Sequence, residues 1–176
     1  MQRYFICNPD EIENKLRTLT KTGDSDDGWT HYYQDNTEKW LLTSFNSAYH
    51  GGGIPVLKRN PEPTDEELID IALTSLNTND IIGASLELSE REKFSKVDFR
   101  GNLLAKLSRF DPSKLDDFEI ERLKLIIKKS DLCDSTNRRE IVGKDLAEIQ
   151  TDANYYRGIS LNAIKILEDI GTKAGG

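Results

Sequence analysis

Apolar residues recur at two different spacings along the chain, and the spacing changes near residue 60. In residues 29–34 aromatic and polar side chains alternate, which is the period of a β-strand. Residues 39–45 and 54–58 are rich in strand-favouring residues, and turn-forming residues 35–38 separate the first two segments. These three segments predict a small antiparallel meander. Since two or three strands alone are marginally stable in water, the meander needs another element to pack on.

The residues before the meander predict a short strand and one helix. Residues 4–7 form a short apolar segment. Asn8 then provides a helix N-cap, and Pro9 occupies the first helical position. Apolar residues follow at helical spacing, so this helix is predicted to reach Thr22, before an acidic loop at 24–28.

From residue 64 onward the apolar spacing is helical throughout. The predicted helices are 65–76, 80–92, 98–110, 114–129, a fifth carrying Val142, Leu146 and Ile149, and a last one carrying Ile159 to Ile170. Because short loops join them, sequence neighbours should pack antiparallel as helical hairpins of the HEAT type. The predicted class is α+β, mostly α, in a single domain 1–176. Within it, 1–60 holds the first helix and the meander, and 61–176 holds the hairpins.

The charge of the chain is concentrated in one segment. The formal net charge is −7, and residues 61–120, with seven basic and fourteen acidic residues, account for all of it. Within 62–92 nine acids face a single base, Arg91. This imbalance argues against nucleic acid or an anionic membrane as partner. It favours a basic protein partner, whose association it would accelerate.

Helical spacing predicts where these acids point. Glu66 and Asp70 lie one turn apart, opposite the apolar positions of helix 65–76. Asp80 and Glu87 are likewise expected to point away from the apolar positions of helix 80–92. The simplest interpretation of any single acid is a solvated helix face. Together they predict an acidic binding surface.

Aromatic residues of the meander supply a second candidate surface. Most of them are expected to pack the sheet onto the helices, as Trp29, His31 and Tyr33 would from one strand face. Tyr and Trp often carry the binding energy at protein interfaces. The residues predicted to bind a partner are Tyr32, Tyr49, His50, Asp65, Glu66, Asp70, Asp80 and Glu87.

No convincing catalytic, cofactor or metal site emerges from the sequence. The chain has two histidines, His31 and His50, and two cysteines, and none has the spacing of a metal motif. The run 51–53 lacks the lysine and the helix of a phosphate-binding loop, so it is interpreted as a tight connection. We therefore expect neither enzymatic activity nor a cofactor. A hydrolase using His31, His50 and the aspartates of 24–27 remains an alternative.

The setting predicted for the chain is the cytoplasm. The first ten residues lack the basic and apolar segments of a secretory signal, and no apolar run approaches the roughly 20 residues of a membrane span. Two cysteines make no disulfide framework, which fits a reducing compartment.

Five segments within about residues 28–110 form a further pattern, in which an aromatic His-Gly-Gly-Gly segment precedes short helices. They are Gly28 to Tyr33, Lys39 to Leu41, Tyr49 to Pro55, Pro63 to Ile69 and Asp80 to Ser85. In this pattern the chain resembles bacterial polymorphic-toxin immunity proteins.

What the resemblance implies is an antidote that binds a cognate toxin in the cytoplasm of the producing cell, as a monomer or small oligomer. A basic nuclease domain is one such toxin, and an acidic inhibitor would cover its active-site surface. The other alternative is a helical-hairpin adaptor that binds a different protein.

Overall fold

A computed structural model describes residues 3–45 and 53–173, with side chains up to residue 171. The α+β class is confirmed, with a five-stranded antiparallel sheet in the N-terminal part and helices making up most of the rest. The chain divides into two compact units, Met1–Glu87 and Leu88–Gly176, and the boundary falls inside helix α3 (Thr78–Ser95). The single-domain organisation stays a prediction.

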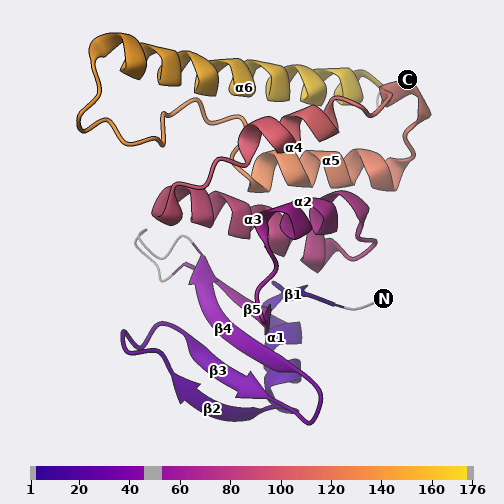
Figure 1. Cartoon of the computed structure of the whole chain (residues 1–176). Helices are drawn as coiled ribbons and strands as arrows, with labels where there is room; N and C mark the ends of the chain where they lie inside the picture. The colour runs from indigo at the N-terminus through magenta and orange to yellow at the C-terminus, as the bar shows by residue number, and fades with distance from the viewer. Residues whose placement is uncertain (1–2, 46–52, 174–176) are drawn as a thin grey trace. The chain divides into compact units, whose positions relative to one another are not determined.

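The N-terminal unit is built on the sheet, with strand order β1-β5-β4-β3-β2 (Figure 1). Its strands are β1 (Phe5–Ile6), β2 (Thr20–Asp24), β3 (His31–Gln34), β4 (Lys39–Phe45) and β5 (Ile54–Asn60). All four pairings are antiparallel. The predicted meander is therefore confirmed as β3-β4-β5, with β1 and β2 added at its two edges.

The second strand corrects the sequence prediction. Helix α1 (Pro9–Leu16) ends at Leu16, and residues that were expected to continue it form β2. Thr20 pairs with Gln34 of β3, and the register shifts between Lys21 and Gly23. Pairing with β2 satisfies the backbone N–H and C=O groups at the open edge of β3. This gain outweighs the weak helical pattern of the residues that form β2.

Apolar side chains cover both faces of the sheet within this unit. On one face Ile12 of α1 packs with Ile6, Trp40 and Leu57. On the other, Phe45 and Val56 pack with Leu86 of α3. These two clusters supply the support that an isolated meander lacks.

Helices α2 (Asp65–Thr74) and α3 follow β5, and α3 approaches β1 very closely. Gly83 lies against the fully buried Phe5, and a Cβ built at Gly83 would be 2.3 Å from Cγ of the Phe5 ring. Only glycine leaves room for this approach.

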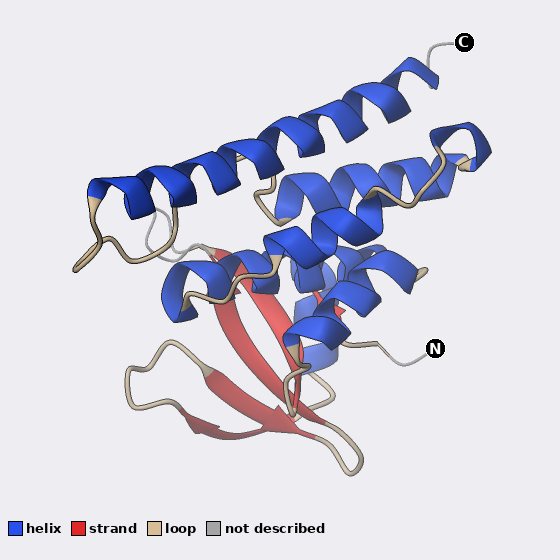
Figure 2. Cartoon of the chain, turned by 45° about the horizontal axis from the view of Figure 1, so that its top comes forward, coloured by secondary structure: helices blue, strands red, loops and turns tan. Residues whose placement is uncertain are grey.

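The C-terminal unit contains α4 (Arg100–Leu107), a 3₁₀ turn η1 (Pro112–Lys114), α5 (Asp117–Lys129) and α6 (Leu146–Lys173). Helix α6 runs along α4 and α5 (Figures 1 and 2). The fifth and last predicted helices are one helix, α6, and Val142 lies in the loop before it. A HEAT-like stacking of the hairpins stays a prediction.

A buried ion pair organises the core of this unit. Arg100 is fully buried and donates to both carboxylate oxygens of Glu92, at 2.7 and 2.8 Å, and to the carbonyl of Asp134 at 2.7 Å. Its guanidinium lies 5.0 Å from the ring centroid of Tyr156. Breaking such a buried pair on one side costs several kcal/mol, so Glu92 serves the fold.

Replacing Gly83 by alanine should destabilise the protein, because the added methyl group would overlap the fully buried Phe5 ring. We expect the free energy of unfolding to fall by about 1–3 kcal/mol in chemical denaturation. Gly158, also in a helix, has open space where a Cβ would lie and is the matched control. Gly158→Ala should stabilise by about 0.5–1 kcal/mol. Equal effects of the two substitutions would contradict the close approach.

Candidate functional site

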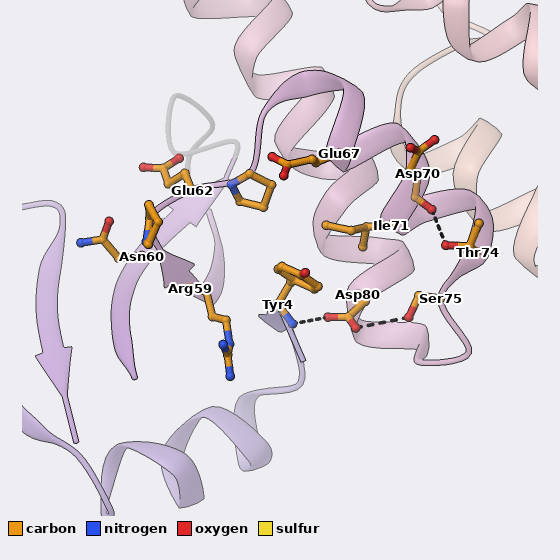
Figure 3. A pocket seen from close by; sticks show the side chains of 12 residues that line it. Tyr4, Arg59, Asn60, Glu62, Glu67, Asp70, Ile71, Thr74, Ser75 and Asp80 are labelled. Carbon is orange, nitrogen blue, oxygen red and sulfur yellow. Dashed lines mark hydrogen bonds between the residues drawn. The ribbon is translucent and has the colours of Figure 1, made fainter. Parts of the chain in front are cut away.

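A groove of about 550 Å³ lies in the N-terminal unit, beside α2 (Figure 3). It is bounded by the start of β1, the end of β5, the turn that follows β5, and α2 with the start of α3. The lining residues are Tyr4, Arg59, Asn60, Pro61, Glu62, Pro63, Glu67, Asp70, Ile71, Thr74, Ser75 and Asp80. Apolar side chains thus share the lining with four carboxylates and one guanidinium.

The start of α2 is fixed by a capping box at 64–67. The hydroxyl of Thr64 accepts from the backbone N–H of Glu67, and the Glu67 carboxylate accepts from the N–H of Thr64 at 2.7 Å. The Glu67 carboxylate accepts from the Thr64 backbone N–H and also from its hydroxyl, and these two hydrogen bonds lower the pKa of Glu67. The carboxylate therefore stays negative at the groove and adds to the favourable charge at the helix N-terminus.

The apolar stripe of α2 decides which acids face solvent. Leu68, Ile69, Ala72 and Leu73 are buried, whereas Glu66 and Asp70 are exposed. Asp65 is half-buried in the first turn. The predicted exposure of Glu66 and Asp70 is confirmed.

Asp80 forms the inner end of the groove and is 2% exposed. One carboxylate oxygen accepts from the backbone N–H groups of Tyr4 and Phe5, both at 2.8 Å. The other accepts from the hydroxyl of Ser75 at 3.2 Å (Figure 3). Asp80 therefore joins α3 to β1, and the expectation that it points to solvent is wrong.

Glu87 is also buried, at 4% exposure, and the prediction that it belongs to the outer surface is wrong. Lys58 of β5 donates to its carboxylate at 2.9 Å and to that of Glu62, at the groove, at 2.8 Å. A carboxylate away from water needs such a partner. The Asp80 and Glu87 carboxylates are inside because nearly every residue from 80 to 89 is buried, so this part of α3 has no solvated side.

The guanidinium at the groove is engaged elsewhere. Arg59 forms an ion pair with Glu38 and lies 5.5 Å from the ring centroid of Trp40. Both partners belong to β4 or the turn before it. Glu38 and the Trp40 ring thus hold the positive charge of Arg59.

The aromatic predictions have mixed outcomes. Tyr32 of β3 is 37% exposed, as expected. Tyr49 and His50 lie outside the described residues. Trp29, expected to pack on the strand face, is 67% exposed in the turn before β3, where its backbone N–H donates to the Asp27 carboxylate at 3.0 Å. The strand begins only at His31, so alternation does not apply to Trp29.

His31, one of the two histidines of the hydrolase alternative, has a local partner. His31 forms a hydrogen bond with Asp24, which also pairs with Lys21 at 2.6 Å. The hydrogen bonds from Lys21 and His31 lower the pKa of Asp24. Among residues 3–45 and 53–173 no group of three or more His, Cys, Asp or Glu side chains has the arrangement of a metal site. Gly53, with a φ of 78°, fits a tight connection.

None of the helices within the described residues has the length and apolar character of a membrane span. Compared with known proteins, the chain matches no protein-family model, no curated protein and no solved structure.

Removing the Asp80 carboxylate should destabilise the protein through the backbone of β1. Asp80→Ala leaves two N–H groups and a hydroxyl without their acceptor, and we expect a loss of about 3 kcal/mol in the free energy of unfolding. Asp80→Asn keeps an acceptor oxygen in place and should cost about 1 kcal/mol. Glu66→Ala, on the exposed face, should change stability by less than about 0.5 kcal/mol. Denaturant unfolding of the three variants checks the order, and an alanine effect as small as that of Glu66→Ala would contradict it.

Proposed function

We propose that this chain is a stoichiometric protein inhibitor that binds a basic toxin in the cytoplasm, and that it is not an enzyme. The observation that carries the proposal is the exposed acidic face of α2, with Glu66 and Asp70 one helical turn apart beside a groove lined by four carboxylates. The toxin as partner is supported by the resemblance of residues 28–110 to immunity proteins.

The electrostatic part of the proposal rests on charges that reach the surface. Asp65, Glu66, Glu67 and Asp70 lie within six residues of one helix, and the last three are exposed. Such a field accelerates encounter with a basic surface, and salt screens it over roughly 8–10 Å. The expected signature is fast, salt-sensitive association.

An adaptor is the second candidate, and one feature of the C-terminal unit favours it. Ile141, Val142 and Leu146 are all exposed, Val142 by 80%, at the start of α6 and in the loop before it. Large exposed aliphatic side chains grouped in this way often mark a protein contact. A partner held through these residues, and indifferent to the α2 acids, would favour the adaptor.

The inhibitor proposal predicts rescue from a toxin. Co-expression of this chain with the toxin encoded by the adjacent reading frame should restore growth, and affinity purification of one should recover the other in a fixed ratio. An unrelated acidic protein of similar size serves as the control for nonspecific attraction. If growth stays inhibited and no complex is recovered, the inhibitor proposal is wrong.

The α2 acids should control the rate of association. Reversal of Glu66 and Asp70 to lysine adds four charges, which changes the formal net charge from −7 to −3. We expect the on-rate to fall by about tenfold at low salt and its salt dependence to flatten, because the attractive field is local to α2. Stopped-flow or surface-binding kinetics over a salt series measures both.

The matched control is an equivalent pair on another helix. Asp117 and Glu121 of α5 are exposed and also one turn apart, and their reversal to lysine gives the same net charge of −3. This control should retain most of the on-rate. Equal slowing by both variants would mean that total charge, and not the α2 surface, governs association.

A further inference from the structure

The groove beside α2 has an apolar interior and a charged rim. Tyr4 and Ile71 lie next to each other in it, with Glu67 reaching over Tyr4, and the Asp70 carboxylate lies beyond Ile71 and points away from Tyr4 (Figure 3). Pro61 and Pro63 add further apolar lining from the turn after β5. A ligand that fits must therefore have an apolar body and a positive end.

Arginine has this combination of properties. Its long stem packs against apolar surface while its head stays charged. Its planar guanidinium stacks on aromatic faces and forms paired hydrogen bonds with carboxylates, which the compact ammonium of lysine does not do. In this groove the aromatic face is that of Tyr4, and the carboxylate that reaches over it is that of Glu67.

We propose that the groove receives an arginine side chain of the basic partner. The partner itself rests on the proposed function, whereas the preference for arginine rests on the groove. The stem lies along Tyr4 and Ile71, and the guanidinium is held by Glu67, with the exposed Asp70 adding negative charge at the rim. Arg59 does not take this place, because Glu38 and Trp40 hold it at the β4 side.

Short peptides test the groove without any toxin. The probes are acetylated and amidated Gly-Arg-Gly, the same peptide with lysine, and the same peptide with citrulline, which keeps the shape of arginine but has no charge. In amide NMR spectra of the labelled full chain, the arginine peptide should shift Tyr4, Ile71 and Thr74 saturably. Citrulline should bind at least about tenfold more weakly, equivalent to about 1.4 kcal/mol. Equal binding of the lysine or citrulline peptide would overturn the assignment to arginine.

Filling the groove separates its shape from the surrounding charge. Thr74 lines the groove at the last position of α2 and is exposed. Thr74→Tyr adds bulk with no change of net charge and should abolish the shifts caused by the arginine peptide, whereas Thr74→Ala should preserve them. Asp70→Asn, at an exposed position, should weaken binding about tenfold without added bulk. Amide resonances away from the groove report that each variant is folded.

The outcomes distinguish the groove from the proposed function. If the arginine peptide binds but no toxin complex forms, the groove stands and the inhibitor proposal fails. If a toxin complex forms and Thr74→Tyr leaves its Kd unchanged, the inhibitor proposal stands and the role of the groove fails. Peptide shifts spread over exposed acids in both units, and unchanged in Thr74→Tyr, would also overturn the groove.

Discussion

The N-terminal unit depends on a buried carboxylate that accepts hydrogen bonds from the backbone of a short edge strand. β1 is only two residues long, so its pairing with β5 contributes few ladder hydrogen bonds of its own. Asp80 supplies acceptors for the N–H groups of Tyr4 and Phe5, and Phe5 in turn packs on Gly83 one turn further along α3. Because a charged acceptor forms stronger hydrogen bonds than a neutral one, this contact compensates for the short strand. The same contact positions two residues of the groove lining, Tyr4 and Asp80.

The acids of 62–92 therefore fall into two sets, which differ in burial. Asp80, Glu87 and Glu92 are buried and have partners, which are the backbone of β1, Lys58 and Arg100 respectively. Their charges are compensated where they lie and contribute little field to the surface. The exposed acids of this segment lie mainly on α2, where the apolar stripe turns Glu66 and Asp70 outward.

Sequence patterns predicted the elements with strong local signals and missed those that depend on the rest of the fold. Helix α2, predicted at 65–76, and the three strands β3, β4 and β5 have such signals, and all of them are present. β2 lacks one, because its pairing with β3 decides its conformation. At the site, the exposure of Glu66 and Asp70 followed from helical spacing. The burial of Asp80 and Glu87 did not follow from it, because the spacing argument assumes that one side of the helix faces water. Over residues 80–89, α3 has no such side. The groove is lined by Tyr4 together with residues between 59 and 80, and no local sequence pattern predicts that these residues lie side by side.

This division of the acids separates binding from stability. Substitution of Glu66 or Asp70 leaves the apolar stripe of α2 and the contacts of Asp80 intact, so a change in association at these positions reports on the surface. Substitution of Asp80 or Glu87 removes an acceptor from the interior, and a loss of binding would then follow from a loss of structure. The same reasoning explains why the nine acids of 62–92 overstate the extent of the proposed binding surface. An acid at helical spacing belongs to the surface only if its side of the helix faces water, and on α2 that condition holds because Leu68, Ile69, Ala72 and Leu73 occupy the other side.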